Sequence, residues 1–600
     1  MKKRVADIVV ETLIELGVDT NFCVVGGGAM HLNNAFEINK DIKTVFCHHE
    51  QSCAFAAEGY AKLTGKTAVV SVTSGPGGAN TLNGVYSAWV DSTPMIVIAG
   101  HPRSDTTVKA CGLNLRSRGV QELDIIPMVK GITKYAQMLE NPYEVKSKIK
   151  TAYFSAMTGR RGPAWISIPL DIQSTIIEEN DCECFLGIND NDPVWNQDTF
   201  KQIIELLNEA ERPVVLTGTG IRYSDAYNEF LEFAKKLSVP IVGGALLSDT
   251  LYEGYPFYYG MSGNLGPRAG NYILQNSDCI LALGNSMSTR QTGFNVDGFA
   301  PNAKLIMVDI SKAEMLKPGL NVYLKVVADL KQFIPAFSDY IKKPITIKKK
   351  WIDYCEGIKE YFYGYDDPKV DDEQRIPEKL FWKTIREKIP DDTVIALGNS
   401  SGMTGIYQYG LMKEKQRILT NYNAGSMGID LPEAIGAAMG TDSPVICATG
   451  DGSIMMNLQE LQTIKYYHFP IKIVVFTNDG YGAIRQTCKN FFNGVYTGCD
   501  EKSGVSFPSF KKVSETFGFE YLLCEKCSEL NSKTDQFLSY KGNIIMEVKQ
   551  LLDDPVCPKI MSKLKADGTF DTPEYTDLFP YLSESEQTEI LKLEETLYKI

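Results

Sequence analysis

The segment ATGDGSIMMNLQELQTIKYYHFPIKIVVFTNDGYGAI, residues 448–484, decides the fold. It leaves an apolar run through a Gly-Asp-Gly turn, continues as a helical stretch, and returns through a proline to a second apolar run that ends in Asn-Asp-Gly. Two short buried strands joined by a helix of this length run parallel in one sheet. The segment therefore predicts an α/β domain built on a parallel sheet.

The same pattern occurs earlier in the chain. Residues 68–100, AVVSVTSGPGGANTLNGVYSAWVDSTPMIVIAG, again read as strand, glycine-rich turn, helix, proline and strand. Between the two copies lie four more short apolar runs, at residues 213–221, 239–247, 278–286 and 304–311. Such runs separated by helical segments indicate a third open parallel sheet. The sequence therefore predicts an α/β fold with three doubly wound parallel-sheet domains, the central one Rossmann-like.

Domain boundaries follow from length and composition. The 600 residues exceed the roughly 250–300 that one hydrophobic core supports. Polar, turn-rich residues near 180–195 and a lysine-rich stretch near 340–370 interrupt the pattern. We expect domains at residues 1–180, 195–340 and 368–550, followed by a tail at 551–600. In the tail, Ser583 and Glu586 have the spacing of a capping box that begins a last short helix.

Composition narrows the class of function. A net charge of −13 argues against a nucleic-acid or membrane surface, because such surfaces need clustered Lys and Arg. No stretch reaches the roughly 18 apolar residues of a membrane span, and the first residues have the spacing of an amphipathic helix rather than a signal peptide. We expect a cytoplasmic protein whose 14 cysteines are reduced.

Glycine-rich turns after strands raise the alternative of a dinucleotide-binding dehydrogenase. The G-x-G-x-x-G pattern fails at both candidate turns, because His31 and Tyr223 stand where the third glycine is needed after Gly26 and Gly218. No lysine of a phosphate-binding P-loop follows these turns either. The spacings therefore disfavour hydride transfer.

Two polar residues follow neighbouring predicted strands. Asp451 ends the first strand of the opening segment and Asn478 ends the second, so both side chains lie at one edge of the sheet. Their oxygens can converge on a hard cation such as Mg²⁺. The turn Gly450, Gly452 and Ser453, at the start of the next helix, can supply amide donors to a phosphate. The alternative is two tight turns, with Asp451 capping a helix.

The Gly-Asp-Gly motif, followed some thirty residues later by Asn, resembles the motif of thiamine-diphosphate enzymes. Three further stretches resemble the acetolactate synthase-like family of these enzymes. They are HHEQSCAFAAEGYAKLTGKTAVVSVTSGPGGANTLNGVYSAWVDSTPMIVIAG (48–100), YYGMSGNLGPRAGN with LALGNSMSTRQTG (258–293), and NAGSMGIDLPEAIGAAMG (423–440). The resemblance implies an N-terminal pyrimidine-binding domain, a central FAD-binding-like domain and a C-terminal domain for diphosphate and Mg²⁺.

The resemblance assigns roles at the cofactor. Asp451, the Asn478 side chain and the Gly480 carbonyl match the family's Mg²⁺ ligands. Gly425 matches the residue whose carbonyl accepts a hydrogen bond from the aminopyrimidine ring, and Met427 the side chain that holds the cofactor bent. Asn399, Ser400 and Ser401 follow a strand and can donate to phosphate oxygens, although they depart from the Gln and His of the synthases.

The residues implied for catalysis lie in the first domain. Glu50 matches the glutamate that hydrogen-bonds the aminopyrimidine ring and favours its imino tautomer, although an acid there also suits a helix N-terminus. Gly27 and Gly28 match a Gly-Gly loop near the thiazolium ring, and Gln121 matches a glutamine beside the reacting carbon. In the family these residues meet the Mg²⁺ site of a second subunit, so the resemblance implies a homo-oligomer with the active site between subunits.

Flavin is a further expectation from the resemblance. The residues that match the family's middle-domain pattern are Gly260, Met261, Arg290, Thr292 and Gly293, whereas Ser288 and Thr289 replace its two acids. We expect FAD alongside thiamine diphosphate and Mg²⁺.

The implied reaction is decarboxylation of a 2-oxo acid, with pyruvate as the expected donor, followed by carboligation to a second carbonyl compound. Simple decarboxylation is an alternative, disfavoured because residues 100–135 contain no pair of adjacent histidines. A non-catalytic regulatory relative is another alternative.

The acceptor is the least determined part of the expected reaction. Thr487 stands where the synthases have a tryptophan that shapes the acceptor site, while Arg290 matches an arginine of the same pocket. The stretches ADGTF and PYLSESEQ resemble synthase-like proteins of unusual sugar biosynthesis. We expect an acceptor such as a keto sugar, with acetolactate formation from two pyruvates as the alternative.

Overall fold

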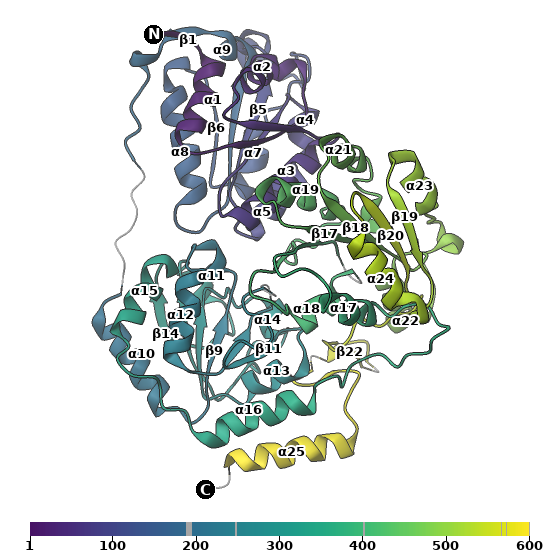
Figure 1. Cartoon of the computed structure of the whole chain (residues 1–600). Coiled ribbons are helices and arrows are strands. Elements are labelled where there is room, and N and C mark those ends of the chain that lie inside the picture. The colour runs from purple at the N-terminus through teal and green to yellow at the C-terminus, as the bar shows by residue number, and fades with distance from the viewer. Residues whose placement is uncertain (188–194, 246–248, 400–401, 566, 572, 599–600) are drawn as a thin grey trace.

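The computed structural model describes residues 1–187, 195–245, 249–399, 402–565, 567–571 and 573–598. It contains three six-stranded sheets in which every neighbouring pair of strands is parallel. Figure 1 shows the three α/β bodies, with the N-terminal one at the top, the middle one at the lower left and the C-terminal one at the right. The predicted fold class is confirmed.

The N-terminal sheet has the order β3-β2-β4-β5-β7-β6. Its strands are β2 (Thr20–Cys23), β3 (Lys43–Phe46), β4 (Val69–Val72), β5 (Met95–His101), β6 (Tyr135–Met138) and β7 (Pro163–Pro169). The principal helices are α1 (Val5–Glu15), α2 (Met30–Ile38), α3 (Glu50–Thr64), α5 (Leu82–Val90) and α8 (Val145–Met157). Every residue of β4, β5 and β7 is buried, as expected for parallel strands covered by helices on both faces.

The C-terminal sheet repeats this topology with the order β16-β15-β17-β18-β20-β19. Its strands are β15 (Val394–Leu397), β16 (Arg417–Leu419), β17 (Val445–Gly450), β18 (Ile471–Thr477), β19 (Glu520–Cys524) and β20 (Ile544–Lys549). Its helices are α17 (Glu378–Arg386), α18 (Thr404–Tyr409), α19 (Asp430–Gly440), α20 (Asp451–Ile454), α21 (Glu460–Tyr467), α22 (Gly482–Phe491), α23 (Phe510–Phe517) and α24 (Leu530–Ser539). The repeat in sequence is therefore a repeat in strand order.

The middle sheet has a different order, β11-β10-β9-β12-β13-β14, which is that of the doubly wound dinucleotide-binding fold. Its strands are β9 (Pro213–Thr217), β10 (Ile241–Gly243), β11 (Tyr258–Met261), β12 (Cys279–Leu283), β13 (Lys304–Asp309) and β14 (Val322–Val327). Its helices include α10 (Gln197–Glu209), α12 (Tyr227–Leu237), α13 (Arg268–Gln275), α14 (Thr289–Thr292) and α15 (Leu330–Tyr340).

Two helices outside the sheets pack against each other along the middle domain (Figure 1). The sequence did not predict the first, α16 (Lys349–Tyr361), which buries Trp351 and Tyr354 in a core of the middle domain. The second, α25 (Glu584–Tyr598), begins at the expected capping box, since Glu586 Oε2 accepts from the Ser583 backbone N–H at 2.7 Å. Its 15 residues make it longer than the short helix that was expected.

The first and third domains share one apolar core at the crossing of α3 and α19. The two backbones approach closely because glycines lie at the contact. A Cβ atom on Gly436 would lie 1.9 Å from the Ala56 carbonyl oxygen, and one on Gly59 would lie 2.4 Å from the Glu433 carbonyl oxygen. Only glycine permits this approach, so the crossing fixes how the two sheets are placed.

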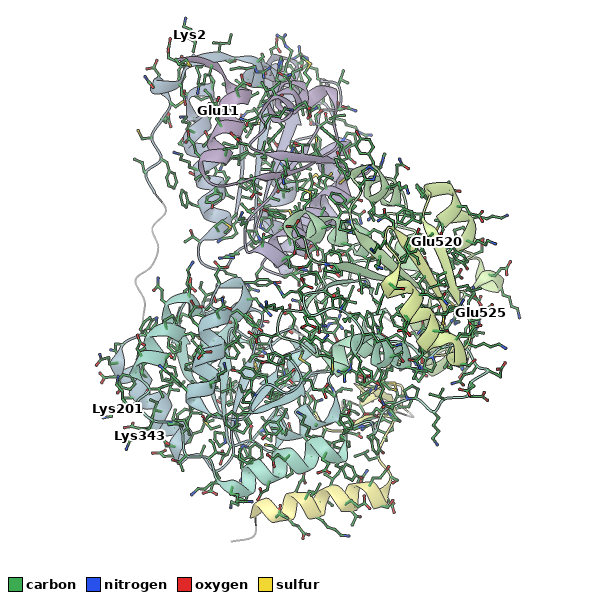
Figure 2. The ribbon with its side chains drawn as sticks, in the orientation of Figure 1. Lys2, Glu11, Lys201, Lys343, Glu520 and Glu525 are labelled. Carbon is green, nitrogen blue, oxygen red and sulfur yellow. The ribbon has the colours of Figure 1, made fainter. Side chains whose placement is uncertain are left out.

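A buried cation lies beside this crossing. The Lys62 Nζ atom is 2.7 Å from Glu58, 3.1 Å from Asp91 and 3.5 Å from Glu433, and it donates to the Thr420 carbonyl oxygen at 2.7 Å. Burial raises the pKa of Glu433 to about 8, against the lowering effect of Lys62. Lys62 differs in its burial from most lysines of the chain, such as Lys201 and Lys343, whose side chains extend from the outer surface of the middle domain (Figure 2).

Replacing Lys62 with Met should destabilise the protein by about 3–5 kcal/mol, because it leaves buried carboxylates without their cation. Lys66→Met is the matched control. Lys66 pairs with Asp19 at the surface, and its side chain is 58% exposed, against 4% for Lys62. We expect the control to change stability by less than about 1 kcal/mol. Urea unfolding of both variants tests this, and equal losses would contradict a structural role for the Lys62 cluster.

Candidate functional site at the sheet edges

The structure brings Asp451 and Asn478 together at the carboxyl edge of the C-terminal sheet. They follow β17 and β18, which are neighbouring strands. One oxygen of the buried Asp451 carboxylate, Oδ2, accepts from the backbone N–H groups of Asn478 at 3.1 Å and Gly480 at 3.4 Å. Burial nonetheless raises the pKa of Asp451 to about 6.

The Asn478 side chain shows what this arrangement can bind. Its Nδ2 donates to Gln550 Oε1 at 3.3 Å, which orients the amide. Its Oδ1 is buried and has no hydrogen-bond partner in the part of the chain that the structure describes. A buried acceptor without a partner is costly unless a ligand satisfies it. Beside a carboxylate, such an oxygen suits a hard divalent cation.

Neighbouring residues hold this corner in place. Gly480 is in close contact, since a Cβ atom there would lie 2.0 Å from the Cys499 carbonyl oxygen. Arg485, which the sequence did not single out, donates to the Asn478 carbonyl oxygen at 2.8 Å from a buried position on α22.

The Gly-Asp-Gly turn forms the first residues of α20, with Gly450 as its N-cap. A Cβ atom on Gly452 would lie 2.2 Å from the Tyr481 ring. The Ser453 hydroxyl is already engaged, because it donates to Asp430 Oδ2 at 2.6 Å and accepts from the Gly428 N–H at 2.9 Å. Backbone amides, rather than the Ser453 side chain, are therefore the groups of this turn that can meet a phosphate.

Asn399, Gly425 and Met427 line one cavity of 480 Å³. Gly425 has a left-handed φ of 61°, and its carbonyl accepts from Asn399 Nδ2 at 2.6 Å. Asn399 thus contacts the backbone position expected to face the cofactor, where a second lone pair stays available. Ser400 and Ser401 lie outside the described residues.

The same cavity has a polar wall that the sequence only partly revealed. Helix α22 lines it with Ala483, Gln486, Thr487 and Asn490, which recur at the i, i+3, i+4, i+7 spacing of one helix face. The Thr487 hydroxyl donates back to the Ala483 carbonyl oxygen at 3.0 Å, so it adds little bulk to the wall.

Two cations line the cavity as well. The Arg290 guanidinium lies 4.4 Å above the centre of the Tyr422 ring, and Lys559 Nζ donates to Gln486 Oε1 at 2.7 Å. Lys559 belongs to β21 (Lys559–Ile560) in the tail. The alternation of strands and helices in the sequence ends before residue 551, so it does not indicate that Lys559 lies near the cavity.

The predicted catalytic residues meet at the carboxyl edge of the N-terminal sheet. The Gly28 N–H donates to Thr73 Oγ1 at 3.1 Å, and Glu50 Oε2 accepts from Asn80 Nδ2 at 2.9 Å. The loop after β4 lies close to both Glu50 and Gln121. A Cβ atom on Gly77 would lie 3.6 Å from Glu50 Oε1, and one on Gly75 would lie 2.5 Å from the Gln121 carbonyl oxygen.

Gly28, Glu50 and Gln121 thus lie around one loop, and Gly27 adjoins Gly28 in the chain. Gly27 and Gln121 are exposed, and Glu50 is half-buried. Thr73 and Asn80 were missed, although both lie in the turn and helix that follow β4. The residues lining the 480 Å³ cavity belong to the middle domain, the C-terminal domain and the tail. Within one chain, therefore, Glu50 does not border the cavity that holds Met427.

A cavity of 300 Å³ lies at the carboxyl ends of β9, β12 and β13, where the middle domain faces the segment after α8 of the N-terminal domain, including Arg160 and Arg161. Its lining includes Thr219, Gly220, Gly284 and Asp309. The residues that match the flavin pattern lie elsewhere. Arg290 borders the 480 Å³ cavity, and Gly260 and Met261 border another cavity near α16. Buried Thr292 directs its hydroxyl to the carbonyl oxygens of Ser288 and Gly293.

Within the described residues, no helix is long and apolar enough to cross a membrane, and no group of three or more His, Cys, Asp or Glu side chains is placed to hold a metal. The corner at Asp451 differs from such a group because it combines one carboxylate with amide and carbonyl oxygens.

Comparison with known families covers each domain. Residues 3–128 match the N-terminal TPP binding domain of thiamine pyrophosphate enzymes, residues 200–337 match the central domain, and residues 397–548 match the C-terminal TPP binding domain. The large subunit of acetolactate synthase isozyme 2 from Escherichia coli is 29% identical over 90% of this chain and 95% of its own length. The acetolactate synthase large subunit of Corynebacterium glutamicum is 30% identical over 88% of this chain and 83% of its own length. The chain therefore belongs to the thiamine-diphosphate-dependent enzymes and is an acetolactate synthase-like transferase.

Proposed function

We propose that this protein decarboxylates a 2-oxo acid, with pyruvate as the donor, and joins the resulting acyl unit to a second carbonyl compound. The observation that carries this proposal is the buried Asn478 Oδ1 without a partner beside Asp451, in a domain that matches the C-terminal TPP binding family. Asp451, Asn478 and the Gly480 carbonyl would hold Mg²⁺ and, through it, the diphosphate. Bound thiamine diphosphate supplies the electron sink for loss of CO₂.

Glu50 is the proposed acid/base group. Asn80 donates to one carboxylate oxygen at 2.9 Å, which leaves the other free to share a proton with the cofactor ring. Because Glu50 and the Met427 cavity do not border each other within one chain, we propose that each complete site combines the N-terminal domain of one copy with the C-terminal domain of another.

Two acceptors are candidates. The names of the relatives support acetolactate synthesis, in which the acceptor is a second pyruvate. The polar face of α22 favours a larger, hydroxylated acceptor such as a keto sugar, because Gln486, Thr487 and Asn490 border a 480 Å³ cavity.

Asp451→Asn should weaken retention of Mg²⁺ and thiamine diphosphate by more than about tenfold, because it removes the charged ligand. Asp535→Asn is the matched control, since Asp535 on α24 is exposed and pairs with Lys388 at 2.8 Å. Metal analysis and calorimetric titration with the cofactor measure both variants. Equal retention by Asp451→Asn and wild type would contradict the metal assignment.

Glu50→Gln should bind the cofactor but lose about 100-fold or more of its rate, because an amide cannot exchange the proton. The assay supplies pyruvate with and without carbonyl acceptors and records CO₂ and acetolactate. Thiazolium-proton exchange tests the role directly and should slow in the same variant. Glu37→Gln, an exposed acid on α2, should match wild type. A wild-type protein that releases no CO₂ from any 2-oxo acid would refute the proposed function.

We also propose that the protein binds FAD. The support is the middle-domain cavity, which lies where the strand order of a dinucleotide-binding sheet reverses, between β9 and β12. The purified protein should be yellow and should release flavin on denaturation. A colourless protein with full activity and no added flavin would overturn this prediction.

A further inference from the structure

The cavity beside Met427 is positively charged although the chain carries a net charge of −13. Its lining residues include Arg290 and Lys559 but no Asp or Glu among those that the structure describes. A concave site with charges of one sign concentrates ligands of the opposite sign. The cavity is therefore suited to an anion.

Lys559 is the more informative of the two cations. Its Nζ contacts the neutral Gln486 oxygen at 2.7 Å, and no carboxylate lies within ion-pair distance of it among the described residues. The side chain is half-buried, and this burial lowers its pKa. The described part of the chain supplies this partly desolvated ammonium group with no counter-charge, which is unfavourable, and a negatively charged ligand would offset that cost.

A 2-oxo acid alone does not account for both cations. Pyruvate carries a single carboxylate, for which Arg290 is available over the Tyr422 ring. Lys559 approaches from a different element, β21 in the tail, and meets the polar face of α22 through Gln486. Thr487 and Asn490 continue that face along the cavity.

From this geometry, and resting on the proposed carboligation, we infer that the acceptor is a hydroxylated carbonyl compound with a negatively charged group, which Lys559 binds while Gln486 and Asn490 contact its hydroxyls. Lys559 is thus a specificity-determining residue. In the reaction, the donor loses CO₂ and its carbonyl carbon forms a bond to the acceptor's carbonyl carbon. The acceptor's carbonyl oxygen takes up one proton, and no electrons leave or enter.

The experiment compares matched acceptors with the holoenzyme and pyruvate as donor. Dihydroxyacetone phosphate against dihydroxyacetone tests a phosphate, and 2-oxoglutarate against 2-oxobutyrate tests a carboxylate. Wild type should prefer the charged member of at least one pair in kcat/KM, and the pair with the larger preference identifies the anion. Lys559→Met should reduce that preference by about 10- to 100-fold, the value of a charge-assisted hydrogen bond. Lys559→Arg, which retains the charge, should preserve most of it.

Lys489→Met is the matched control, because Lys489 lies on α22 but pairs with Asp553 at 2.8 Å and does not line the cavity. It should keep the wild-type preference. A wild type without preference in either pair, or a Lys559→Met enzyme that loses charged and neutral acceptors equally, would overturn the inference. If pyruvate yields no CO₂, the proposed function fails separately. Calorimetric titration of the holoenzyme with dihydroxyacetone phosphate and 2-oxoglutarate still decides the inference, which requires weaker binding by Lys559→Met than by wild type.

Discussion

The crossing of α3 and α19 is the contact on which the arrangement of the molecule depends. A side chain at Gly59 or at Gly436 would clash with the backbone of the opposite helix. The close contact between the two helices therefore depends on these glycines facing the partner helix. The apolar side chains around them belong to a single core shared by two domains. Lys62 adds a directional constraint, because its position satisfies acids from α3, the end of α5 and α19 together. The two related sheets therefore form one unit, and both active-site edges have fixed positions in it.

All three groups of candidate site residues lie where a sheet reverses its strand order. Gly28 and Thr73 follow β2 and β4, Asn399 and Asp451 follow β15 and β17, and the middle cavity lies beyond β9 and β12. At such a point the connections on either side lead to opposite faces of the sheet, which leaves a crevice with backbone amides at its base. The crevices in the first and third domains lie at corresponding places because the two sheets have the same strand order.

The sequence predicted what depends on local pattern. Buried β-branched runs predict the strands, and their spacing places Asp451 and Asn478 at one edge of a sheet. It could not predict contacts that depend on chain crossings. Arg485 looks like an ordinary helix residue, and α16 lies in the lysine-rich stretch that marks a domain boundary in the sequence, because its lysines precede its buried face. Lys559 stands in a segment without periodicity, and only the packing of the tail against α22 brings it to Gln486.

The tail differs from every other part of the site in how it is attached. It leaves the C-terminal sheet after β20, contributes β21 to the cavity, and is anchored at its far end where α25 packs on α16. None of the tail residues that the structure describes belongs to the three sheets. Substitutions in the tail can therefore alter one wall of the 480 Å³ cavity without changing the strands that precede the proposed cofactor ligands. A change of substrate preference in this fold therefore needs only a few substitutions in the tail, which lies outside the three sheets.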